Sequence, residues 1–191
     1  MQVIPRADWH LAATDWVSEK SQEYGAQSIC LPAGNTAIRL FDYWTQQPPE
    51  SLRNKSLHQL DEVGRRFALF FRRYLPRYQV LPPHEDMRPD LAILGLGYNG
   101  HVAFHEPGIP ASFRYGKVTL LPETAHRLGV EPGTEAWTIG VGALTEAKAL
   151  LLIILGAEKW GIFQQAYSDQ RLPAHWLLPH PDLTILTDQT W

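Results

Sequence analysis

The sequence predicts an α/β protein of three layers, with a Rossmann-like, mainly parallel sheet covered by helices on both faces. Its strand-like segments are continuous apolar runs, of which Ala149 to Leu155 is the longest, and they alternate with helical patterns. Strands of this kind are buried on both faces, which is typical of parallel sheets. The chain has 191 residues, of which 45% are hydrophobic and 19% charged, so we expect one domain over 1–191.

Apolar spacing and helix breakers define the elements of the first half. They predict, in order, a helix over 6–24 that stops at Gly25, a strand over 28–31, a helix around 38–44 that ends at Pro48, a short strand over 57–61 and a helix over 63–78. On the last helix, four arginines are expected to face solvent, namely Arg65, Arg66, Arg72 and Arg73.

The second half continues the alternation. The same criteria predict a strand over 90–97 leading into a glycine-rich turn, a strand or lid edge over 117–121, a strand over 137–141, one helical turn over 145–148, a strand over 150–155, a helix over 156–168 and a last strand over 183–186.

Composition excludes several classes of partner. The net charge is −3 and there is no basic block, so neither nucleic acid nor a membrane surface is expected to bind. Cys30 is the single cysteine, the histidines lack metal-ligand spacing, and the longest apolar run is too short to span a bilayer. We therefore expect a cytoplasmic protein without a metal. Assembly into a homo-oligomer is a further alternative, because some of the seven tryptophans could lie at a subunit interface.

The densest polar cluster, Asn99 to Glu106, follows the apolar strand that begins at Leu91. Ligands of open parallel sheets bind outside the carboxyl ends of strands, so this position suits a site. His101 could transfer protons near neutral pH while Glu106 orients it. Asn99 could fix the imidazole ring through its amide, or merely make the turn that its Asn-Gly pairing favours. The alternative is a histidine that merely hydrogen-bonds a turn. We expect His105 to be structural.

Two further segments could hold an anion. Gly34, Asn35 and Thr36 lie between a strand and a helix, where backbone N–H groups can bind phosphate, although Thr36 could be only a helix cap. Lys159 lies in the first turn of a helix, where a cation opposes the helix dipole unless an anion such as phosphate compensates it, or the side chain extends into water. Asp61, at the end of a short strand, could act as a carbon base or be simply solvated.

Taken in order, these segments resemble the glucosamine-6-phosphate deaminase family, which is related to 6-phosphogluconolactonases. Residues 94–108, LGLGYNGHVAFHEPG, are similar to the deaminase pattern L-G-[IL]-G-x-[DN]-G-H-[IV]-[AG]-F-N-E-P, whereas lactonases lack the Phe-x-Glu-Pro ending. Similarity also covers the phosphate turn at 31–36, the Asp-Glu segment at 60–62, and the segments 139–142 and 155–159.

The resemblance implies a shared substrate for the candidate residues. His101, oriented by Glu106 and Asn99, would open the pyranose ring of glucosamine 6-phosphate or its galacto epimer, and Asp61 would move a proton between C2 and C1. The 6-phosphate would be held by Gly34, Asn35, Thr36 and Lys159. No organic cofactor or metal is implied, and the partner is the small phosphosugar.

Some positions depart from the family pattern. The segment between Glu62 and Asp90 is shorter, and the family's lid arginine has no clear match, which leaves Arg114 and Arg127 as candidates. A phosphosugar lactonase and a non-catalytic phosphosugar-binding protein are the alternative functions.

Overall fold

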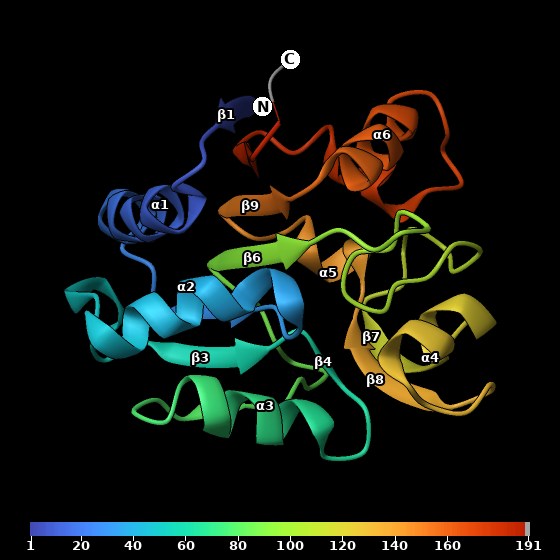
Figure 1. The fold of residues 1–191 in the computed structure, drawn as a ribbon, viewed down its shortest axis with the longest axis horizontal. Coiled ribbons are helices and arrows are strands. Elements are labelled where there is room, and N and C mark those ends of the chain that lie inside the picture. The colour runs from blue at the N-terminus through green and yellow to red at the C-terminus, as the bar shows by residue number, and fades with distance from the viewer. Residues whose placement is uncertain (190–191) are drawn as a thin grey trace.

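A seven-stranded sheet runs through the centre of the protein (Figure 1). The structure is a computed structural model that describes residues 1–189. Every neighbouring pair of strands in the sheet is parallel. The strand order is β1 (Gln2–Pro5), β10 (Leu183–Thr187), β9 (Ala149–Ile154), β6 (Leu91–Gly95), β2 (Ser28–Leu31), β3 (Ser56–Gln59) and β5 (Val80–Leu81).

Helices cover both faces of this sheet, which confirms the predicted fold class. One apolar cluster joins alternate strand residues such as Leu151 and Ile153 to α1 (Trp9–Tyr24), α2 (Asn35–Gln46) and α3 (Arg66–Tyr74). The other joins Leu150, Leu152 and Ile154 to α5 (Val141–Leu144), α6 (Ala157–Ala166) and the 3-10 helix Pro173–Leu177. The continuous apolar runs therefore arise because both faces of each strand are buried.

A smaller antiparallel sheet stands beside the main one. It consists of β4 (Asp61–Glu62), β8 (Glu135–Ile139) and β7 (Tyr115–Thr119), with α4 (Pro122–Leu128) on the connection between β7 and β8 (Figure 1). The predicted strand over 57–61 is wrong in one respect, because the chain changes sheet within it. The Leu60 N–H donates to Leu31 O in the large sheet, and Leu60 O accepts from the Ile139 N–H of β8.

Other boundaries also differ from the prediction. α3 ends at Tyr74 rather than at 78, since Pro76 disfavours helical geometry at the preceding residue. The helical turn expected at 145–148 is wrong, and α5 lies before it instead. The short elements β1, β5 and α4 were not predicted. The four arginines of the third helix are exposed, as expected.

The order of strands creates a switch point between β2 and β6. From β2 the chain adds β3 and β5 on one side and then returns to add β6 and β9 on the other. The connections leaving β2 and β6 diverge there, which leaves room for a ligand at their carboxyl ends. Across residues 1–189, no helix has the length and apolar content needed to cross a membrane.

Candidate active site

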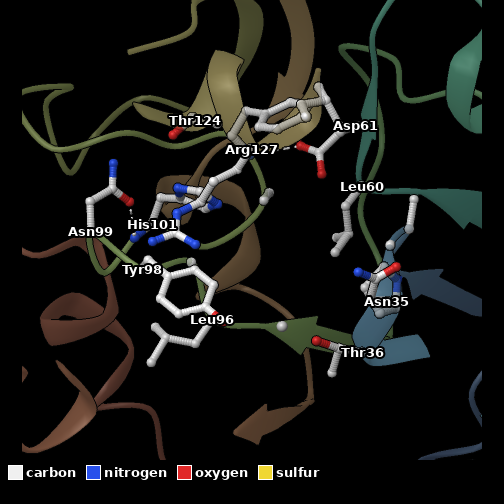
Figure 2. Close-up of a pocket in the computed structure, with 18 of the residues that line it drawn as sticks. Asn35, Thr36, Leu60, Asp61, Leu96, Tyr98, Asn99, His101, Thr124 and Arg127 are labelled. Carbon is white, nitrogen blue, oxygen red and sulfur yellow. Dashed lines mark hydrogen bonds between the residues drawn. The ribbon is translucent and has the colours of Figure 1, made fainter. Parts of the chain in front are cut away.

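A cleft of about 420 Å³ lies at the carboxyl ends of the central strands, at the switch point. Its lining comes from four separate parts of the chain: residues 32–36 after β2, residues 60–61 after β3, seven residues between the end of β6 and Ala103, and Lys159 in α6. Glu123, Thr124, Arg127 and Leu128 of α4 line it as well. Figure 2 shows Asp61 on one side of the opening and Asn99 and His101 on the other.

The structure brings the sequence-predicted site residues together around this cleft. Seven of them line it, namely Gly34, Asn35, Thr36, Asp61, Asn99, His101 and Lys159. The eighth, Glu106, is buried immediately behind Asn99 and His101. Residues that are as much as 125 positions apart in the sequence thus meet because their strands end at one edge of the sheet.

Asp61 is buried in the wall of the cleft, with 7% of its surface exposed. Its Oδ1 accepts hydrogen bonds from the Thr138 hydroxyl at 2.6 Å and from the Phe104 N–H at 2.8 Å. Burial raises the pKa of Asp61 to about 7, although the two hydrogen bonds and the nearby His101 act in the opposite direction. A carboxylate with this pKa can accept and return a proton near neutral pH.

The ring of His101 lies against the backbone of Gly97. A Cβ at position 97 would lie 2.3 Å from the ring atoms Cε1 and Nε2, so only glycine leaves room for the imidazole. His101 Nδ1 is 3.4 Å from Glu106 Oε2, close enough for an ion pair when the ring is protonated, but it makes no hydrogen bond within residues 1–189.

Asn99 acts on the main chain rather than on the imidazole ring, so of the two roles that the sequence left open the structure favours the turn. Its Oδ1 accepts from the His101 backbone N–H at 3.2 Å, and its Nδ2 donates to Glu106 Oε2 at 2.7 Å. Burial alone would raise the pKa of Glu106, but His101 and Asn99 outweigh it and the pKa is lowered. Glu106 is therefore ionised at neutral pH.

The glycine turn at residues 32–34 leads into α2. Gly34 has φ +104°, in the region that favours glycine, and Asn35 and Thr36 follow it as the first residues of the helix. Thr36 is therefore not the N-cap residue, and no side-chain capping hydrogen bond is present at this helix start. The helix is 12 residues long, and its first residues line the cleft, where the N–H groups of a helix start lack intrahelical partners.

Two cations meet at the exposed ring of Tyr98. The Arg127 guanidinium carbon lies 3.7 Å and the Lys159 Nζ 5.1 Å from the ring centroid. Neither cation forms an ion pair with a carboxylate in the part of the chain that the structure describes. Burial, and then the proximity of Arg127, lower the pKa of Lys159. Two neighbouring cations without carboxylate partners favour an anionic ligand.

The geometry distinguishes the two arginines that the sequence left as alternatives. Arg127 lines the cleft, and Figure 2 shows it beside Tyr98 and His101. Arg114 forms an ion pair with Glu146 and donates to Gly142 O at 3.0 Å, outside the cleft lining.

His105 is fully buried and structural in its contacts. Its Nε2 is 3.1 Å from Ile109 O, and its Nδ1 accepts from the Val141 N–H at 3.1 Å. In the range 1–189, no three His, Cys, Asp or Glu side chains are arranged to hold a metal ion.

The sequence did not single out two residues of the site, Tyr98 in the cleft and Thr138 behind Asp61. Tyr98 lies inside the motif but was treated as a variable position, and Thr138 lies in an apolar strand of the second sheet. A polar residue between Trp137 and Ile139 was the available signal for Thr138.

A doubly wound parallel sheet with a polar switch-point cleft defines the class of α/β proteins that bind small molecules at strand ends. Residues 49–186 match the family model described as glucosamine-6-phosphate isomerases/6-phosphogluconolactonase. The match covers most of the chain, and the chain belongs to this family.

Curated relatives and solved structures are consistent with that membership. The chain is 39% identical over 110 residues to a glucosamine-6-phosphate deaminase of Bacillus cytotoxicus and 36% identical to one of Bacillus thuringiensis. Each alignment covers 52% of this chain and 42% of the relative, so the chain matches less than half the length of those proteins.

Two solved structures share the fold over almost the whole chain. A monomeric glucosamine-6-phosphate deaminase has a TM-score of 0.80 at 20% identity, covering 99% of this chain and 98% of that one. A 6-phosphogluconolactonase from Trypanosoma cruzi has a TM-score of 0.78 at 17% identity, covering 97% and 93%.

Proposed function

We propose that the protein converts a 2-amino-hexose 6-phosphate, glucosamine 6-phosphate or its galacto epimer, to the ketose 6-phosphate and ammonia. The observation that carries the proposal is the convergence of a buried carboxylate, an imidazole and two cations on one cleft. Removal of a proton from a sugar carbon requires a base such as the carboxylate or the imidazole. Binding of a phosphate dianion requires cations such as the other two groups.

Phosphate binding is assigned to the side of the cleft that carries positive charge. The N–H groups at the start of α2, the half-buried Lys159 and the guanidinium of Arg127 provide donors of complementary charge. Anchoring the phosphate there fixes the sugar carbons relative to Asp61, and this positioning lowers the barrier to proton transfer.

The acid–base steps are assigned to His101 and Asp61. His101, with Glu106 behind it, transfers the proton that opens the pyranose ring. Asp61 then removes the proton from C2 and returns it to C1, while O1 gains a proton and the amino nitrogen loses one, so that the C1 aldehyde becomes an alcohol and C2 an imine. Water adds at C2 and ammonia leaves, which gives the ketose without a net change of oxidation state. The pKa of about 7 matches Asp61 to this task.

A coupled ammonia-release assay with glucosamine 6-phosphate and galactosamine 6-phosphate tests the proposal. We expect release by the unmodified protein and loss of release in Asp61→Asn and His101→Ala. His126→Ala is the matched control, because His126 is exposed and does not line the cleft. Hydrolysis of 6-phosphogluconolactone that survives Asp61→Asn, with no ammonia release, would replace the deaminase with a lactonase.

A binding protein without turnover is the remaining outcome. In that case calorimetry would show phosphosugar binding, weakened by Lys159→Met, while ammonia release and lactone hydrolysis stay at background. Either result would refute the deaminase proposal.

A further inference from the structure

Thr138 lies directly opposite Asp61 in the small antiparallel sheet. The register pairs Asp61 of β4 with Thr138 of β8, so the two side chains are adjacent across the strands. Thr138 is fully buried. Its hydroxyl donates to Asp61 Oδ1 at 2.6 Å, a distance typical of an O–H···O⁻ hydrogen bond to an ionised acceptor.

The same hydroxyl has two other polar neighbours. Thr138 Oγ1 is 3.0 Å from Ile139 O and also 3.0 Å from the Phe104 N. A hydroxyl carries a single proton, and the shortest contact directs it to Asp61. The Phe104 N–H is shared between Thr138 Oγ1 and Asp61 Oδ1, so two donors, the Thr138 hydroxyl and the Phe104 N–H, hold one carboxylate oxygen in place.

The other oxygen of Asp61 is left for the substrate. Oδ2 accepts no hydrogen bond from the residues that the structure describes, and Asp61 borders the cleft. Figure 2 shows the Asp61 carboxylate at the edge of the open space of the pocket. Both protein donors bind the same oxygen, so the carboxylate cannot rotate to exchange its two oxygens without breaking these hydrogen bonds.

We propose that Thr138 is a positioning residue for Asp61: it fixes Oδ1 so that Oδ2 is presented to the carbon from which the proton is taken. This inference rests on the proposed function, in which Asp61 is the base. Thr138 does not contact the substrate in this scheme. It acts only through Asp61.

The loop that supplies the second donor is itself constrained. Ala103 has φ +53°, a conformation that is unfavourable for a residue with a side chain, and it directly precedes Phe104. This turn directs the Phe104 N–H at Asp61, and Phe104 packs on Phe67 with ring centroids 5.7 Å apart. The strained loop and the second sheet thus supply one donor each to the same carboxylate oxygen.

Other titratable groups around Asp61 also affect its pKa. Glu62 on the same strand raises the pKa of Asp61, while His101 from the loop after β6 lowers it. Cys30 of β2 has a raised pKa because of burial and the charge of Asp61, so it stays a neutral thiol. The hydroxyl of Thr138 favours the ionised form of Asp61, and its removal should raise the pKa of Asp61.

The experiment compares Thr138→Val, Thr138→Ser and Thr184→Val in the full chain. Valine has nearly the shape of threonine but no hydroxyl, and serine restores the hydroxyl. Thr184 is the matched control, because it is a buried strand threonine that accepts a hydrogen bond from Trp16 at 3.1 Å outside the cleft. For each variant the pH dependence of kcat/KM for ammonia release is measured.

Thr138→Val removes a hydrogen bond to a charged group. The acidic limb of its kcat/KM profile against pH should therefore lie about one pH unit higher than in the unmodified protein. We expect kcat to fall at least tenfold with KM changed less than threefold, since the phosphate contacts remain. Thr138→Ser should restore both the limb and kcat. The inference would be overturned if the acidic limb of the kcat/KM profile does not shift in Thr138→Val, or if it shifts equally in Thr184→Val.

A second measurement does not depend on activity. The carboxyl carbon of Asp61 can be followed by NMR as pH is varied, with assignment by its absence in Asp61→Asn. If the protein releases no ammonia, the proposed function fails, and an upward shift of the Asp61 titration in Thr138→Val still supports the coupling between the two side chains. An unshifted titration refutes that coupling whether or not ammonia is released.

Discussion

Replacing Arg127 by methionine removes one of the two cations at Tyr98 and preserves much of the side-chain volume. The structure limits the expected effect. Arg127 is exposed, so solvent screens its charge more than that of the half-buried Lys159. A charge-assisted hydrogen bond contributes about 1.5–3 kcal/mol, and we expect the lower end for Arg127, which corresponds to roughly a tenfold loss of affinity for the phosphosugar. The same reasoning predicts about a hundredfold loss for Lys159→Met.

The assay is steady-state ammonia release together with calorimetric binding of the phosphosugar. We expect KM and Kd to rise in Arg127→Met while kcat changes little, because in the proposed binding mode the guanidinium binds the phosphate and transfers no proton. Inorganic phosphate should protect the unmodified protein from thermal unfolding more than it protects this variant.

Arg114→Met is the matched control, because Arg114 binds Glu146 outside the cleft. We expect its KM to stay within twofold of the unmodified protein. Equal losses in the two variants, or the same loss for a sugar without phosphate, would refute the assignment of Arg127 to the phosphate.

Three further predictions concern the buried groups of the cleft. Burial raises the pKa of Asp61 to about 7 in the folded state, so the free energy of unfolding falls as pH rises from about 4, where the unfolded carboxyl ionises, to about 7, and the full cost remains at higher pH. Asp61→Asn should therefore raise the melting temperature at pH 8 but not at pH 4 in calorimetry, while abolishing ammonia release. Gly97→Ala should displace the ring of His101 and lower kcat by more than tenfold, whereas Gly161→Ala, which has open space around its added methyl, should leave kcat unchanged. Tyr98→Leu removes cation–π contacts and should raise KM severalfold, with Tyr98→Phe close to the unmodified protein in the same assay; equal KM values in the leucine and phenylalanine variants would contradict this role.

Much of the site was predictable because its residues lie in short local patterns. The segment 94–108 carries its own turn residues, its imidazole and its carboxylate, and it follows an apolar strand. The start of α2 is marked by Gly34 in the same way. Patterns of this kind depend on neighbours in the sequence, so they survive without knowledge of the rest of the fold.

Contacts between segments that are distant in the sequence were harder to predict. Asp61 was expected at the end of a strand of the main sheet, but the chain changes sheet at Leu60 and pairs Asp61 with Thr138, 77 positions later. The two-residue strand is too short to show a periodicity, and the strand predicted over 137–141 carries no signal of which segment it pairs with. Arg127 could not be distinguished from Arg114 for the same reason, since α4 and its orientation depend on packing against the cleft.

The sequence by itself determined the α/β class, the family resemblance and the types of side chain available for chemistry, because these follow from hydrophobic runs and local motifs. Only the tertiary structure decided which oxygen of Asp61 is free, which arginine joins Lys159, and that Asn99 holds the main chain of His101 rather than its ring. The physical reason is that hydrogen bonds and charge proximity depend on distances of a few ångströms between segments, and those distances are set by the packing of both sheets together.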